Sequence, residues 1–144
     1  MRFWDSSAIV PLLVEEPASA ATRQLIRTDP TMVVWCLARV EVASALQRLL
    51  RAGALRPEAI ADAQNKLTRL ATRWSEVDAL VPVRELAERL LRLHALRAAD
   101  ALQLAAALLA FEERPRGRSF VTSDDALLAA AAREGFDAIR PKER

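Results

Sequence analysis

Three aspartates stand out among the 19 acidic residues of this 144-residue sequence. Asp100 lies near the start of an apolar stretch, residues 98–111, in which Gln103 is the only other polar side chain. A buried, isolated carboxylate is costly, so we expect Asp100 to be paired, protonated or bound to a metal. Two alternatives involve no chemistry: a salt bridge to Arg97, or a place in the first turn of a helix, where the helix dipole favours acids.

Asp5 and Asp124 each follow a short apolar segment that predicts a strand running into a helix. An aspartate at such a junction is a common N-cap, worth about 1 kcal/mol. Both have hydroxyl neighbours that could cap the helices instead and so free the carboxylates. These neighbours are Ser6, Ser7, Thr122 and Ser123.

Glu41 is a weaker candidate on its own residues. It falls on the polar flank of a predicted helix over residues 38–51, two turns before Arg48, so periodicity predicts a surface side chain. If acids at strand ends and helix starts converge on one pocket, their charges repel one another. Oxygen ligands without histidine suit Mg²⁺ or Mn²⁺, and such sites serve phosphoryl transfer.

The elements that must position these acids alternate between strands and helices. The predicted strands cover residues 2–4, 31–35, 77–81, 120–122 and 136–139. The predicted helices cover residues 18–27, 38–51, 57–74, 82–94, 98–111 and 125–134, and a further helix follows Asp5. This order predicts a three-layer α/β/α sandwich with a mainly parallel sheet, whose ligands lie at the carboxyl ends of the strands.

Composition limits the other possibilities. The length supports one domain over residues 1–144, and a net charge of +2 gives no case by itself for a general electrostatic grip on nucleic acid. Three glycines in a chain rich in Ala and Leu argue against an all-β sandwich. The lone Cys36 cannot form an internal disulfide, and the longest apolar run is too short to span a membrane. We therefore expect a cytoplasmic protein with no membrane partner.

Four segments together resemble the PIN-domain ribonucleases, specifically the VapC-like toxins of type II toxin–antitoxin pairs. They are FWDSSA at 3–8, RVEVASAL at 39–46, LRAADALQLA at 96–105 and FVTSD at 120–124. Each segment is degenerate, but four in this order form a fairly specific signature that runs from end to end. One departure is Cys36, where many relatives carry Ser or Thr after the second strand.

The resemblance implies that Asp5, Glu41, Asp100 and Asp124 form an acidic quartet that binds Mg²⁺ or Mn²⁺. It implies supporting roles for Ser7 and Thr122. It further implies a homodimer, inhibition by a small antitoxin whose tail covers the active site, and cleavage of structured RNA such as transfer or ribosomal RNA. The expected function is therefore a metal-dependent endoribonuclease, in which an ion activates water for attack on a phosphodiester.

Some alternatives stay open at this level. The same fold could be a catalytically inactive PIN-like domain that binds a partner, its acids serving only as helix caps. DNA is also a chemically possible substrate, because nothing in the sequence reads a 2′-hydroxyl. The basic loop containing Arg114, Arg116 and Arg118 could hold RNA backbone, although a solvated loop is the simpler interpretation. His94, the only histidine, has no second histidine nearby and is expected to be structural.

Overall fold

Five parallel strands form one sheet in the order β3-β2-β1-β4-β5 in the computed structural model, which describes residues 1–142. The last two residues of the expected 1–144 domain lie outside the described residues. The strands are β1 (Arg2–Trp4), β2 (Met32–Trp35), β3 (Ser75–Val77), β4 (Ser119–Val121) and β5 (Asp137–Ile139). Their order confirms the expected parallel sheet.

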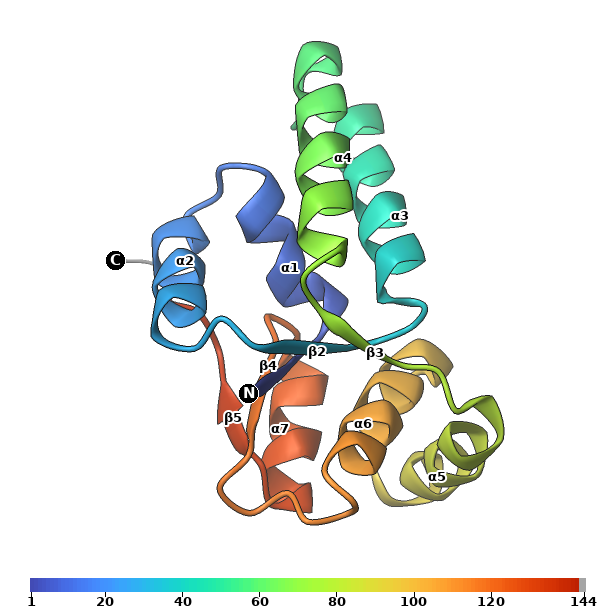
Figure 1. Cartoon of the computed structure of the whole chain (residues 1–144). Coiled ribbons are helices and arrows are strands. Elements are labelled where there is room, and N and C mark those ends of the chain that lie inside the picture. The colour runs from blue at the N-terminus through green and yellow to red at the C-terminus, as the bar shows by residue number, and fades with distance from the viewer. Residues whose placement is uncertain (143–144) are drawn as a thin grey trace.

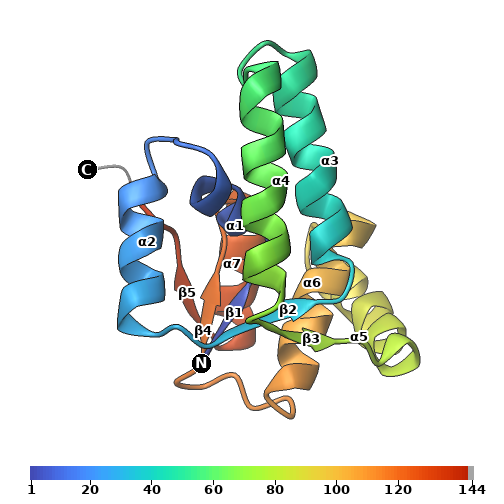
Figure 2. The same ribbon diagram turned by 45° about the horizontal axis from the view of Figure 1, so that its top comes forward.

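Helices cover both faces of this sheet (Figure 1). The first four are α1 (Ser6–Leu13), α2 (Ser19–Thr28), α3 (Ala38–Arg51) and α4 (Pro57–Ala71). The last three are α5 (Leu80–Leu93), α6 (Ala98–Ala110) and α7 (Asp125–Glu134). Helices α1, α3 and α4 pack on one face, with α2 beside α1, and α5, α6 and α7 pack on the other. Figure 2 shows that α3 and α4 extend as a pair beyond the sheet. The expected three-layer sandwich is thereby confirmed.

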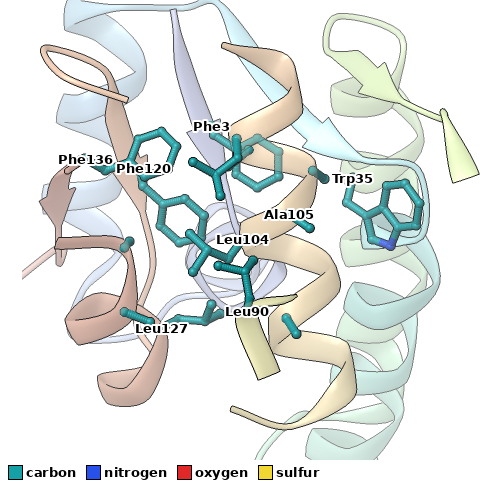
Figure 3. Close-up of a cluster of buried hydrophobic side chains, with 14 of the residues drawn as sticks. Phe3, Trp35, Leu90, Leu104, Ala105, Phe120, Leu127 and Phe136 are labelled. Atoms are coloured by element: carbon teal, nitrogen blue, oxygen red, sulfur yellow. The ribbon is translucent and has the colours of Figure 1, made fainter. Parts of the chain in front are cut away.

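Alternating side chains along the strands build the two cores. Phe3 faces the α5–α7 layer, whereas its neighbour Trp4 faces the α1–α4 layer, because successive side chains of a strand point to opposite faces. Phe3 stacks on Phe120 of the neighbouring strand, with ring centroids 5.3 Å apart. Leu104 of α6 lies against this cluster (Figure 3). Helix α6 is therefore fixed firmly to the sheet.

The structure corrects some predicted boundaries. Strand β3 covers Ser75–Val77 rather than residues 77–81, and α5 begins at Leu80, two residues before Pro82. Proline is tolerated in a first helical turn, where its missing N–H would have had no partner. Helix α4 ends at Ala71 rather than at residue 74, and the side chain of Trp74 packs into the core beneath the helices.

The strand order reverses between β1 and β4, which makes this the topological switch point of the sheet. The chain adds β2 and β3 on one side of β1 and then returns to add β4 and β5 on the other. At such a switch point, the loops after the two central strands diverge and leave a crevice at the carboxyl edge. Asp5 follows β1 and Asp124 lies three residues after β4, so both acids lie beside this crevice.

No single helix among residues 1–142 is long and apolar enough to cross a bilayer. Helices α5 and α6, which meet at a bend of 117°, have sufficient length and apolar composition only when taken together.

Candidate functional site

Strand register places Asp5 beside Thr122. Trp4 of β1 pairs with Val121 of β4, and the next backbone N–H, that of Asp5, donates to the Val121 carbonyl at 3.0 Å. The following residue of the β4 segment, Thr122, is therefore level with Asp5. Its Oγ1 donates to Asp5 Oδ2 at 2.9 Å.

Asp5 is the most deeply buried acid of the quartet, with 3% of its surface exposed. Its Oδ2 accepts hydrogen bonds from the hydroxyls of Ser7 and Thr122, and from the Ser7 backbone N–H at 3.3 Å. Its Oδ1 has one long contact, 3.4 Å from Ser6 Oγ. Burial raises the pKa of Asp5, and the hydrogen bonds from Ser7 and Thr122 partly oppose that rise. One oxygen is thus anchored and the other is weakly engaged.

Both aspartates at the strand ends act as helix caps, the common role of an aspartate at such a junction, and the neighbouring hydroxyls do not cap in their place. Asp124 Oδ1 accepts from the Leu127 N–H at 2.8 Å at the start of α7, and Asp5 caps α1 through the Ser7 N–H. The Ser7 and Thr122 hydroxyls instead donate to Asp5. Each aspartate caps its helix through one oxygen, so its second oxygen does not take part in the cap.

Glu41 is not the surface residue that periodicity predicts. It lies half-buried in the first turn of α3, where Oε2 accepts from Ser6 Oγ at 3.1 Å and Oε1 accepts from Gln103 Nε2 at 3.0 Å. Burial raises the pKa of Glu41, and the Asp5 and Asp100 charges add to the rise. The helical wheel fails here because α1 and α6 supply the groups that cover the polar flank of α3.

Asp100 is half-buried rather than buried. It lies in the first turn of α6, and the buried side of this helix begins with Ala101. Burial raises the pKa of Asp100, and the neighbouring charges of Asp124 and Asp5 raise it further. A backbone hydrogen bond from Arg97 and the charge of that residue oppose the rise. First-turn placement therefore describes Asp100 correctly, and burial together with the acidic neighbours outweighs the opposing effect of Arg97 on its pKa.

The four acids form one electrostatic group. Asp124 acts on Asp5, Asp5 and Asp100 act on Glu41, and Asp5 and Asp124 act on Asp100. Such mutual repulsion favours a divalent cation, and carboxylate oxygens suit Mg²⁺ or Mn²⁺. Among residues 1–142, however, no three acidic, histidine or cysteine side chains are already arranged to hold one ion. The quartet fits a hard cation in donor type and charge, whereas its oxygens do not yet converge.

Comparison with family models matches residues 2–132 to the PIN domain. The chain belongs to the PIN domain family. PIN domains are generally nucleases, which agrees with an acidic site at this edge of the sheet. A search of curated proteins gives no match.

Solved structures show the same fold at low sequence identity. The protein PAE2754 from Pyrobaculum aerophilum is 22% identical, with a TM-score of 0.66 over 96% of this chain and 87% of that one. A toxin–antitoxin complex from Klebsiella pneumoniae gives 16% identity and a TM-score of 0.66, with both chains fully covered. FitAcB from Neisseria gonorrhoeae gives 16% identity and a TM-score of 0.65 over 98% of each chain.

Two cavities adjoin the acidic site of this PIN domain, and Ser7 lines both. The first, of about 410 Å³, lies between α1, α3 and the start of α6, and Arg48 is its basic residue. The second, of about 390 Å³, lies under the C-terminal segment, where Arg140 and Lys142 line it together with one acid, Glu16. Each cavity therefore holds at least one basic side chain, and Glu41 itself lines the first.

Two candidate RNA or metal contacts lie elsewhere. The loop with Arg114, Arg116 and Arg118 precedes β4, so it lies at the amino edge of the parallel sheet, opposite the acids. His94 Nε2 lies 3.0 Å from a Glu134 carboxylate oxygen near the end of α7, so this histidine joins two helices away from the site.

The sequence did not predict the supporting contacts made by three residues. Gln103 and Ser6 hold Glu41, and Arg140 donates to the Ser123 carbonyl at 2.7 Å while pairing with the exposed Asp125 at 2.6 Å. A single amide in an otherwise apolar helix was a signal for Gln103. The contacts of Ser6 and Arg140 join segments far apart in sequence, and no local pattern marks them.

Proposed function

We propose that this PIN domain is a Mg²⁺- or Mn²⁺-dependent endoribonuclease and the toxin of a type II toxin–antitoxin module. The observation that carries the proposal is the quartet itself. Four acids from four separate segments lie near the switch point of a parallel sheet, and the charges of their acidic neighbours help to raise the pKa of Asp5, Glu41 and Asp100. Family membership and the fold shared with toxin–antitoxin structures support the same function.

The residues of the site have three different roles: binding the ion, orienting Asp5 and capping helices. Asp5, Glu41, Asp100 and Asp124 would hold the ion, which supplies activation of water and stabilisation of phosphate charge when bound. Ser7 and Thr122 orient Asp5 through its Oδ2. The caps fix the backbone of Asp5 and Asp124 at the starts of α1 and α7. The second oxygens of these two carboxylates lie outside the caps and would be available as ligands to the ion.

The two cavities support a single-stranded segment of RNA as the substrate. A strand crossing the acids from one cavity to the other would place its flanking phosphates near Arg48 on one side and Lys142 on the other. Arginine and lysine bind phosphates well, and contacts of this kind position a nucleic acid without reading its bases. Structured transfer or ribosomal RNA would offer such a segment in a loop.

Exposed apolar side chains support the proposal of two protein partners, an antitoxin and a second copy of this chain. Leu37 and Val40, 46% and 67% exposed, flank the start of α3 close to Glu41, which suits the tail of an antitoxin covering the site. Leu80 and Leu93, at the two ends of α5, are also more than half exposed and suit a homodimer contact. We place the activity in the cytoplasm, where RNA and a small antitoxin would both be available.

A cleavage assay tests the catalytic proposal. Purified wild-type protein, Asp5→Asn and Asp100→Asn are incubated with cellular RNA and Mn²⁺, and with single-stranded DNA in parallel. Of these three proteins, we expect only the wild type to cleave RNA. Asp62→Asn, which changes an exposed acid on α4, is the matched control and should cleave normally. Equal cleavage by all four proteins refutes the metal-quartet mechanism, and cleavage of DNA alone refutes the choice of RNA.

The capping role of the two aspartates favours a second candidate, an inactive PIN-like domain that binds a partner. In that case the acids only stabilise helix starts. Titration with Mn²⁺ at neutral pH separates the two functions. Absence of Mn²⁺ binding by the wild type supports the inactive domain.

A further inference from the structure

Gln103 is a fully buried amide in a helix that is otherwise apolar after its first turn. Its exposed fraction is 0%, and the buried residues around it on α6 are alanines and leucines. Its Nε2 donates to Glu41 Oε1 at 3.0 Å, across 62 positions of sequence. Its Oε1 is buried and has no hydrogen-bond partner among residues 1–142.

Packing alone does not account for this amide. A buried carbonyl oxygen without a partner opposes folding, and an apolar side chain of similar volume would avoid that cost. The single bond that Gln103 makes runs to a carboxylate of the quartet. The side chain is therefore explained by what it does to Glu41.

The contacts of Glu41 show what that effect is. A carboxylate offers about four acceptor positions on its two oxygens. Ser6 of α1 occupies one position on Oε2, and Gln103 of α6 occupies one on Oε1. Two donors from different helices fix the plane of the carboxylate, and one position on each oxygen remains for a cation. Unlike lysine or arginine, the neutral amide does not place a second positive charge beside the ion.

We propose that Gln103 is a positioning residue that holds Glu41 ready to bind the divalent cation. The spacing of α6 fits this role, because Asp100 and Gln103 are three residues apart and lie on one side of the helix. Asp100 belongs to the quartet, and Gln103 supports a second member of it from one turn further along. This inference rests on the proposed metal site, which the experiment tests separately.

The experiment measures Mn²⁺ binding by calorimetry on the full chain, without RNA, and the thermal midpoint without metal. Gln103→Met removes the donor and keeps the volume. We expect Mn²⁺ affinity to fall roughly 10- to 100-fold, as for other residues that orient metal ligands. The metal-free midpoint should change little, because the loss of the bond to the half-buried Glu41 is offset by removal of the buried, unpaired Oε1. Gln103→Asn, whose shorter amide cannot span the same distance, should lose affinity as well.

Two further proteins make the result specific. Leu104→Met places the same side chain at the next, fully buried position of α6 and should bind Mn²⁺ normally. In a Glu41→Gln background, Gln103→Met should cause no additional loss, because residues that act through one another are not additive. Wild-type affinity in both Gln103 variants, or an equal further loss in the Glu41→Gln background, overturns the inference. A wild type that binds no Mn²⁺ overturns the proposed function and this inference together.

Discussion

Thr122→Val is a direct test of how the site is held together. Thr122 is fully buried, its hydroxyl donates to Asp5 Oδ2 at 2.9 Å, and it accepts from the Asp124 N–H at 3.0 Å. Valine keeps the shape and removes both bonds. The Thr122 hydroxyl donates its one hydrogen to Asp5 Oδ2, and the Ser7 hydroxyl does the same. Neither hydroxyl then has a hydrogen to donate across the 3.3 Å contact between them, so this contact adds little.

The size of the effect follows from these two bonds. A hydrogen bond to a charged group contributes about 1.5–3 kcal/mol, and an unpaired buried N–H costs at least about 1 kcal/mol. Solvent does not screen the loss, because Asp5 is buried. We therefore expect Thr122→Val to lower the free energy of unfolding by about 3 kcal/mol at pH 8. Ser7 remains as a donor to Asp5, so the site should weaken without unfolding the chain.

Urea unfolding followed by circular dichroism in EDTA measures this loss. With a slope of about 2 kcal/mol per molar urea, the midpoint should fall by roughly 1.5 M. Thr122→Ser is the control, since it keeps the hydroxyl and loses one methyl group, at about 1 kcal/mol. The difference between the two variants should shrink at pH 4, because the raised pKa of Asp5 leaves less charge to stabilise. Equal losses in the two variants at pH 8 would refute the reasoning.

Two more predictions address charge at the site. Burial and acidic neighbours raise the pKa of Asp100 above its ordinary value of 3.8. The protonated carboxyl is therefore favoured in the folded protein, and the stability that this contributes is fully present below pH 3.8 and is lost as the pH rises through the raised pKa. The metal-free Asp100→Asn protein should therefore gain stability relative to wild type between pH 4 and pH 8, and a constant difference in urea midpoint would contradict the shift. Lys142→Ala and Arg48→Ala should each weaken the binding of a short RNA strand in EDTA several-fold. Each should also reduce the magnitude of the slope of log affinity against log salt concentration by about one. Anisotropy measures this, and an equal effect of Arg116→Ala, at the opposite edge of the sheet, would instead indicate general attraction to the chain.

Much of the fold follows from local sequence patterns. The alternation of apolar strands with amphipathic helices predicts the parallel three-layer sandwich, because strands joined by helices have few other arrangements. Boundaries are less certain where two patterns overlap. Leu80 and Val81 resemble a strand locally, but they begin α5, because Pro82 fits within the first turn of a helix.

The candidate site is predictable to a different degree for each acid. Asp5 and Asp124 are visible as acids after apolar strands, and Asp100 as an acid in an apolar helix. Glu41 is visible only through the family resemblance, because its own helix gives it a polar, surface-like position. Its half-buried state comes from Ser6 and Gln103, which other helices contribute.

The sequence by itself predicted the fold class and the family, and it marked Asp5, Asp100 and Asp124 as candidate site acids, because these depend on residue types and on spacing along the chain. Tertiary structure alone decided how the acids are held. The register of β1 against β4 brings Thr122 to Asp5, and the packing of α6 brings Gln103 to Glu41. It also decided that Asp5, and not Asp100, is the deeply buried acid. Burial and charge coupling depend on distances between segments far apart in sequence, and these distances exist only once the chain has folded.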